Sequence, residues 1–283
     1  MSPSHTLPYP QPHRLARKTG LALAALAALT AGGAALAATT QVTVRIDNLA
    51  PANSVTFAPL HLGFNNGSFD AFNIGQVAGA AIVSVAEGGA GGAWQTAFGL
   101  ADPGATRGTI GGPLLPGASK TAVFMVDPVL NPFFTFATMV VPSNDLFIGN
   151  DSPTRYRLFD GAGNLQITSI GQSARQIWDA GSEVFDPAAA AFVGNNSLRS
   201  PQNSVVAFNF AELAAFNGLS TAAGYTFHSG LAADNEVYRI SFSTAPVPEP
   251  ESYALMAAGL MALGGLTRRR RAQAQSARDL ISA

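Results

Sequence analysis

The sequence predicts an all-β protein, a single antiparallel β-sandwich domain, and three observations carry this prediction. Residues 41–49 alternate apolar and polar side chains, the period-two pattern of a strand with one buried face. Residues 121–126 and 134–141 are apolar, β-branched and aromatic runs, each closed by a proline within two residues. Residues 160–164, Asp-Gly-Ala-Gly-Asn, are a strong hairpin signal. Short strands separated by such turns favour two packed sheets over an α/β fold.

The other elements are assigned from the same patterns. Helical content is expected to be small: residues 72–83, weakened by Gly75 and Gly79, and residues 211–216. Glycine-rich residues 87–92 and 108–117 are expected to be long surface loops. Further strands are predicted at residues 156–158, 165–170, 205–210 and 237–242.

The C-terminal segment has the layout of a targeting signal. It opens with a proline-rich strip: Val247, Pro248, Glu249 and Pro250. Proline lacks a donor N–H and disfavours helix before it, so this strip is expected to be extended and accessible. Residues 253–266 are apolar, but this stretch is shorter than the roughly 20 residues that span a bilayer comfortably. A basic cluster that favours the cytoplasmic side comes next: Arg268, Arg269, Arg270 and Arg271.

This order of features, over residues 245–271, resembles the bacterial PEP-CTERM tail. The resemblance implies recognition and removal by an exosortase-type processing enzyme, with transient membrane association through a C-terminal transmembrane helix. An ordinary tail anchor is the alternative. Residues 272–283 depart from the pattern, because such tails usually stop at the arginines.

The N-terminal segment, residues 1–37, is predicted to be a signal peptide. Basic residues precede an apolar run at residues 20–30, and Ala35 and Ala37 supply the small-x-small pattern of signal peptidase. Cleavage there would start the mature chain near Ala38, and the product would be exported to the cell surface or beyond. A retained anchor is the alternative, and Gly32 and Gly33 argue against it because they interrupt the apolar run.

Residues 38–244 are left as one domain, long enough to bury a core without cross-links. The chain has no cysteine, which excludes disulfides, thiolate metal sites and cysteine nucleophiles. Residues 39–244 hold eight Lys and Arg against fourteen Asp and Glu, a net charge of −6. This mildly acidic domain has no electrostatic footprint for nucleic acid, and it could attract cations or cationic partners.

Two acidic segments are the best candidates for a binding site. Asp145 lies between two apolar stretches, where a plain surface turn would not need such neighbours. Asp179 and Glu183 are four residues apart around an Ala-Gly turn, so their carboxylates can converge. Ca²⁺ prefers six to eight oxygen ligands, often carboxylates and carbonyls on loops. The three residues could therefore form a calcium site at one end of a sandwich, unless they are merely solvated turn residues.

Both segments also resemble motifs of the spondin N-terminal domain family. Residues 143–149, Ser-Asn-Asp-Leu-Phe-Ile-Gly, are similar to its Ser-x-Asp-x-Phe-x-Gly segment. Residues 178–183, Trp-Asp-Ala-Gly-Ser-Glu, are similar to its aromatic-Asp-Ala-Gly-Thr-Asp/Glu motif. The likeness extends in order over most of residues 40–200. It implies a C2-like β-sandwich that binds calcium through Asp145, Asp179 and Glu183 and serves adhesion or matrix contact rather than catalysis.

Two other functions are weighed against this one. Paired carboxylates can hydrolyse glycosides, so an extracellular polysaccharide hydrolase is the alternative enzyme hypothesis. A purely structural matrix protein is the third hypothesis, and exopolysaccharide or another surface component is the candidate partner. His61, in an apolar context, is expected to be a hydrogen-bonded structural residue. The sequence contains no Gly-x-Ser-x-Gly elbow and no His-Glu-x-x-His zinc helix.

Overall fold

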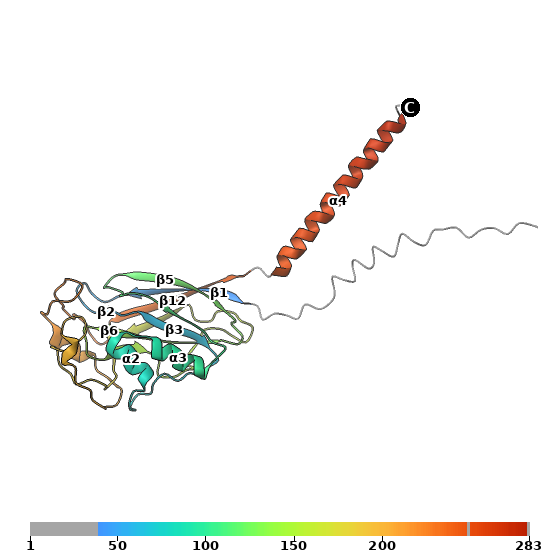
Figure 1. The fold of residues 1–283 in the computed structure, drawn as a ribbon. Coiled ribbons are helices and arrows are strands. Elements are labelled where there is room, and N and C mark those ends of the chain that lie inside the picture. The colour runs from blue at the N-terminus through green and yellow to red at the C-terminus, as the bar shows by residue number, and fades with distance from the viewer. Residues whose placement is uncertain (1–38, 248–249, 282–283) are drawn as a thin grey trace, which may run out of the picture. The chain divides into compact units, whose positions relative to one another are not determined.

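The computed structural model describes residues 39–247 and 250–281, and Figure 1 shows its two packed β-sheets. All the pairings between strands are antiparallel, which confirms the predicted sandwich. The smaller sheet has four strands in the order β5 (Ser119–Val126), β1 (Thr40–Asn48), β12 (Glu236–Pro246), β9 (Ser169–Ser173). The larger sheet has the order β11 (Ala207–Phe208), β10 (Trp178–Asp179), β7 (Leu146–Gly149), β6 (Phe133–Val141), β3 (Leu60–Asn65), β4 (Thr106–Ile110). Two short strands, β2 (Thr56–Phe57) and β8 (Tyr156–Arg157), also pair with β6.

Strand β1 shows the alternation that the sequence predicts. Val42, Val44 and Ile46 are buried, while the residues between them face outward or lie at partial exposure. β1 lies between β5 and β12, and its first residue, Thr40, pairs with both Val126 and Pro246. The first and last strands of the domain are therefore neighbours, and β1 begins at the end of the sheet where β12 finishes.

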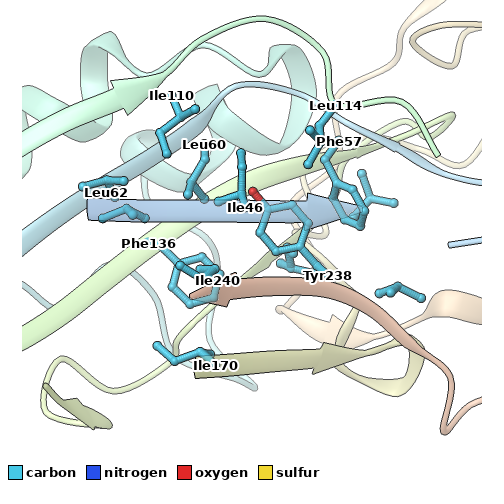
Figure 2. Packing of buried hydrophobic residues seen from close by; sticks show 14 of the residues in the cluster. Ile46, Phe57, Leu60, Leu62, Ile110, Leu114, Phe136, Ile170, Tyr238 and Ile240 are labelled. Atoms are coloured by element: carbon cyan, nitrogen blue, oxygen red, sulfur yellow. The ribbon is translucent and has the colours of Figure 1, made fainter. Parts of the chain in front are cut away.

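The main core fills the space between the two sheets. Figure 2 shows Ile46 of β1 with Tyr238 and Ile240 of β12, opposite Leu60, Leu62 and Phe136 of the larger sheet. Tyr238 packs its ring edge-on against Phe57 at 4.6 Å between centroids, an arrangement that aromatic rings favour. Burial of these apolar side chains stabilises the sandwich, which has no disulfide.

Two helices cover the outer face of the larger sheet, so its central strands are buried on both sides. α2 (Ala80–Gly88) and α3 (Gly92–Ala101) pack through Ile82, Val85, Trp94 and Phe98 onto a second apolar cluster. Gly63 of β3 makes the close approach possible, since a Cβ there would lie 2.2 Å from the Phe98 ring. Because both faces are covered, β6 is apolar almost throughout rather than alternating.

The first helical prediction is displaced, whereas the second is found in place as a 3₁₀ helix. The expected helix at residues 72–83 starts only at Ala80, because Gly75 adopts φ +79 and Gly79 is the N-cap in extended conformation. The expected loop at residues 87–92 shortens to a turn, where Gly89 at φ +63 caps α2 before α3 begins. Residues 211–216 form a 3₁₀ helix, Phe210–Phe216, and two shorter ones lie at Ala174–Gln176 and Asn196–Leu198.

Several strand boundaries also differ from the prediction. β9 starts at Ser169 rather than at residue 165, and β11 keeps only two residues of the predicted run 205–210. β4 takes up the first part of the expected loop at 108–117. β12 continues to Pro246, two residues beyond the predicted end of the domain, so no linker separates the sheet from the proline-rich strip.

The C-terminal segment is a single helix, α4 (Pro250–Ile281). Pro250 is its first residue, a position where the missing N–H costs nothing, so the predicted extended strip ends sooner than expected. The helix also continues beyond the apolar residues 253–266 and through the arginines, because Ala, Arg and Gln favour helix. In the described part of the chain, no helix carries an apolar stretch long enough to cross a membrane, so the expected transmembrane helix is not found there.

Candidate functional site

Strands β7 and β10 place Asp145 and Asp179 at one end of the larger sheet. The two strands pair with Asp179 opposite Leu146, so Asp145 lies one residue from this pair. The backbone N–H of Ala180 donates to the Asp145 carbonyl at 3.1 Å and continues the pairing past the strand ends. The two acidic segments therefore lie side by side, with Asp145 in the bend just before β7 and Asp179 at the end of β10.

The turn that follows Asp179 wraps around the Asp145 carboxylate. Asp145 Oδ2 accepts hydrogen bonds from the Ser182 N–H at 2.7 Å, the Glu183 N–H at 3.0 Å and the Ser182 hydroxyl at 3.1 Å. The turn depends on Gly181, which adopts φ +67 and whose N–H donates to Asp179 Oδ1 at 2.7 Å. The Asp-Ala-Gly-Ser-Glu sequence thus builds an anion-holding turn on the neighbouring strand.

Asp145 is buried, and this burial has an electrostatic consequence. Loss of solvation, followed by repulsion from Asp179, raises the pKa of Asp145 to about 6 despite the hydrogen bonds from Ser182 and Glu183. Two carboxylates in such proximity resist ionising together, and a bound cation would relieve this repulsion.

The third carboxylate of this cluster is Glu212, a residue that sequence reasoning missed. It lies in the 3₁₀ helix Phe210–Phe216, and burial together with repulsion from Asp179 and then Asp145 raises its pKa to about 8. The Asn209 amide links the groups, because its Nδ2 donates to Asp179 Oδ2 and to Glu212 Oε2, both at 3.1 Å. We call Asp145, Asp179 and Glu212 the acidic cluster.

The carboxylate of Glu183, the third predicted ligand, forms an ion pair with Arg199. Its Oε1 lies 3.2 Å from the Nε of Arg199, whose Nη2 donates to the Glu87 carbonyl at 2.6 Å. The contact is an ion pair without the alignment of a hydrogen bond, and Glu183 Oε2 is buried with no hydrogen-bond partner. Burial raises the pKa of Glu183 to about 7, opposed by Arg199. The structure therefore brings the backbone N–H of Glu183 to Asp145, whereas its carboxylate pairs with Arg199 and is repelled by Glu87 and Asp145.

The other expected residues are placed as follows. His61 is buried, with Nδ1 3.0 Å from the Thr109 hydroxyl and Nε2 3.0 Å from the Gly89 carbonyl, which confirms its structural role. Across the described residues, no three His, Cys, Asp or Glu side chains form a preassembled metal centre. The acidic cluster would consequently have to tighten around a cation.

Little in the sequence could have identified Glu212. It lies in a weakly patterned Ala- and Phe-rich segment, far along the chain from Asp145 and Asp179. Its one sequence signal is Asn209, an N-cap-type residue three positions earlier, which begins the 3₁₀ helix and carries Glu212 toward the sheet.

The predicted sorting residues lie in the C-terminal part of the chain. Val247 follows β12 directly, and the four arginines Arg268–271 are exposed along α4. Pro248 and Glu249 lie outside the described residues, as do the predicted cleavage residues Ala35 and Ala37 and the rest of the predicted signal peptide.

Comparison with known proteins bears on this end of the chain. No curated protein sequence matches the chain significantly. Residues 246–271 match the family model of the PEP-CTERM protein-sorting motif, and this match begins at the last residue of β12. The chain therefore carries a PEP-CTERM sorting motif, which implies processing by an exosortase-type system and export to the cell surface or extracellular space.

Proposed function

We propose that residues 40–246 form a spondin-like, calcium-binding domain with a non-catalytic role in adhesion or in the extracellular matrix. The acidic cluster carries this proposal: Asp145, Asp179 and Glu212 lie toward one end of the sandwich, and burial, followed by repulsion among them, raises the pKa values of Asp145 and Glu212. The export signal agrees with such a role, because calcium is plentiful outside the cell.

The donor set suits a hard cation. The carboxylates of Asp145, Asp179 and Glu212 are oxygen ligands of the kind that Ca²⁺ prefers, and Ca²⁺ tolerates irregular coordination. In the structure the Asn209 amide N–H bridges Asp179 and Glu212, and so supplies part of the positive charge that a cation would supply more strongly. A bound Ca²⁺ would hold the 3₁₀ helix Phe210–Phe216 against β10 and fix this end as a contact surface.

Glu183 has a supporting role in this proposal. Its N–H and the Ser182 N–H hold Asp145 Oδ2, which orients the carboxylate, while the ion pair with Arg199 holds the turn. We accordingly place Asp145, Asp179 and Glu212 as ligands and Glu183 as the residue that positions Asp145.

Thermal unfolding of the chain from Ala38 onward, first with EDTA and then with Ca²⁺ or Mg²⁺, tests the proposal. Binding to the native state stabilises by about 2.7 kcal/mol at one hundred times Kd. Ca²⁺ should raise the melting temperature more than Mg²⁺, and Asp179→Asn should lower the Ca²⁺ affinity more than tenfold, about 1.4 kcal/mol. Asp234→Asn, at an exposed ion pair with Arg175, is the matched control.

If Ca²⁺ does not change the melting temperature of the metal-free protein, the calcium site is wrong. The adhesion role has its own test, in which the protein is incubated with exopolysaccharide from the producing cells, with and without Ca²⁺. Calcium-dependent retention that is lost in Asp179→Asn would link the site to the partner, whereas equal retention by both proteins would place the contact elsewhere.

One observation favours the hydrolase alternative. Glu212, with a pKa of about 8, would be protonated at neutral pH and could donate a proton, as a glycosidase acid does. However, two cavities adjoin the cluster, one of about 230 Å³ beside Ala180, Gly181 and Ser182 and one of about 380 Å³ beside Asn209, and neither is lined by these carboxylates. Release of reducing ends from exopolysaccharide that is lost in both Asp145→Asn and Glu212→Gln would favour the enzyme.

A further inference from the structure

The domain has a distinct end from which both of its flanking segments leave. Thr40, at the start of β1, pairs with Pro246, at the end of β12, and Figure 1 shows the two strands ending together. The segment predicted to be a signal peptide precedes Thr40, and the sorting motif starts at Pro246. Both targeting segments are thus attached to adjacent strands with almost no linker, and we call this the exit end.

Exposed apolar side chains gather at the exit end. β5 finishes beside Thr40, since Val126 pairs with Thr40, and Met125 of the same strand is 46% exposed. The loop that follows carries Val129 and Leu130, which are 57% and 64% exposed. We call Met125, Val129 and Leu130 the exit patch.

The loop that presents the exit patch is well defined. Asp127 Oδ1 accepts hydrogen bonds from the backbone N–H groups of Val129 and Leu130, both at 3.0 Å. The Asn131 amide donates to the Gly104 carbonyl at 3.2 Å, and the Leu158 N–H donates to the Pro132 carbonyl at 2.8 Å. The loop is therefore held on both sides, and within the described part of the chain its two aliphatic side chains stay largely exposed.

We infer that the exit end docks on the lipid surface while the chain is still tethered, with Val129 and Leu130 inserted among the lipid headgroups. The proposal rests on the sorting motif and not on the calcium site. A membrane-processed tail attached directly to β12 leaves this end, rather than any other, facing the bilayer. Exposed Arg157, which pairs with Phe133 at the end of this loop, adds a positive charge that suits headgroup phosphates.

The acidic cluster lies at the other end of the sandwich. β6 runs from Phe133, next to the exit-end loop, to Val141, and Asp145 follows that far end. Nine residues of strand span roughly 27 Å. Docking through the exit patch would therefore hold the sorting motif at the membrane interface for processing while the acidic cluster faces away from it.

Because the exit patch is small, it would not keep the domain on the membrane after the tail has been removed. A whole lipid chain gives only marginal membrane binding, and the aliphatic side chains of Val129 and Leu130 bury much less apolar area. The patch therefore orients the chain only while the tether keeps it at the surface, and removal of the tail would free the domain.

Because the chain has no cysteine, a single label reports one position without ambiguity. The full chain with Leu130→Cys, labelled with an environment-sensitive dye, would be reconstituted into phosphatidylcholine vesicles that contain a lipid-attached quencher. We expect a blue-shifted emission and strong quenching at residue 130. A label at Val184→Cys, which is 43% exposed and next to Glu183 at the acidic end, should show neither.

A second variant separates docking from mere proximity to the tether. Adding Val129→Asp to the Leu130→Cys chain should abolish the quenching, while Val184→Asp in the same chain should leave it unchanged. Equal quenching with and without Val129→Asp would overturn the proposal, and so would a label at residue 130 that is as unquenched as the one at 184. A label at 130 that is buried only when the processing enzyme is added would assign the patch to that protein instead.

Discussion

The acidic cluster shows how single residues acquire a role that their neighbours in the sequence do not reveal. Asp179 and Glu183 share a turn, yet their carboxylates separate: Asp179 bonds with Asn209, and Glu183 pairs with Arg199. Glu212 comes from a distant segment and shares the amide of Asn209 with Asp179. The outcome depends on which direction each side chain leaves the backbone.

At this scale, the first prediction concerns pH. The pKa values of Asp145, Glu183 and Glu212 are raised to about 6, 7 and 8. The native state therefore holds more protons than the unfolded chain between about pH 4 and pH 8. It follows that the free energy of unfolding of the calcium-free protein decreases as pH rises through this window.

Glu212→Gln should make this decrease smaller, because it removes the group with the highest of the three pKa values. The measurement is the melting temperature in EDTA at pH 5 and at pH 8.5. Glu236→Gln, on a surface pair with Arg239, is the control and should leave the slope as it is. A Glu212→Gln slope equal to that of the parent would contradict the assigned burial of Glu212.

The second prediction concerns Gly181. An alanine there would have to keep φ at +67, which costs about 1–2 kcal/mol, and its Cβ would lie 2.7 Å from the Ser204 backbone. Gly181→Ala should therefore destabilise the protein by at least about 2 kcal/mol and weaken the hold on Asp145. Chemical denaturation measures this change, and Gly161→Ala, where a Cβ meets open space, should be nearly neutral.

At the scale of elements, the third layer of α2 and α3 is what converts a simple sandwich into a sheet buried on both faces. Phe98 of α3 stacks on Phe69 at 4.2 Å between centroids, contacts Trp94 edge-on at 4.9 Å and lies over Gly63. The absence of a side chain at Gly63 and the bulk of Phe98 are therefore complementary, one on a strand and the other on a helix.

Phe98→Ala should destabilise the protein by about 3–5 kcal/mol, because it leaves a cavity under α3. The free energy of unfolding from urea titration would measure it. Leu100→Ala, at a residue 80% exposed on the same helix, should change stability by less than about 0.5 kcal/mol. Similar effects for both variants would show that α3 is not packed as described.

At the scale of the whole molecule, the order of the strands connects folding with export. β12 is the last strand to leave the membrane in an exported chain, yet it lies between β1 and β9. Its buried residues Val237, Tyr238, Ile240 and Phe242 contribute to the main core. The smaller sheet therefore cannot close until almost the entire domain has been translocated.

A truncation series tests this dependence. Removal of residues 248–283 should leave the melting temperature unchanged, because both sheets end by Pro246. Removal of residues 236–283 should unfold the domain, since the four buried side chains contribute together about 6–12 kcal/mol, comparable with the whole stability of a domain. Circular dichroism distinguishes the outcomes, and a folded product of the longer truncation would rule out a central role for β12.

The sequence by itself determined the features that depend on local pattern. Alternation at β1, proline-closed apolar runs and turn residues were sufficient for the two-sheet fold, and the C-terminal order of strip, apolar run and arginines was sufficient for the sorting motif. The motifs also singled out Asp145 and Asp179 as candidate calcium ligands, a role that stays a prediction.

Only the tertiary structure decided what depends on packing between distant segments. The apolar residues of β3, β6 and β7 do not alternate because helices cover their second face, so period-two reasoning could not locate β3 and β7. Glu212 lies close enough to Asp179 to be repelled by it, and Glu183 forms an ion pair with Arg199. Both contacts are made by segments that come together only in the fold. The local sequence pattern predicts where a strand with one exposed face lies. The contacts of a buried side chain depend instead on which distant segment packs against it.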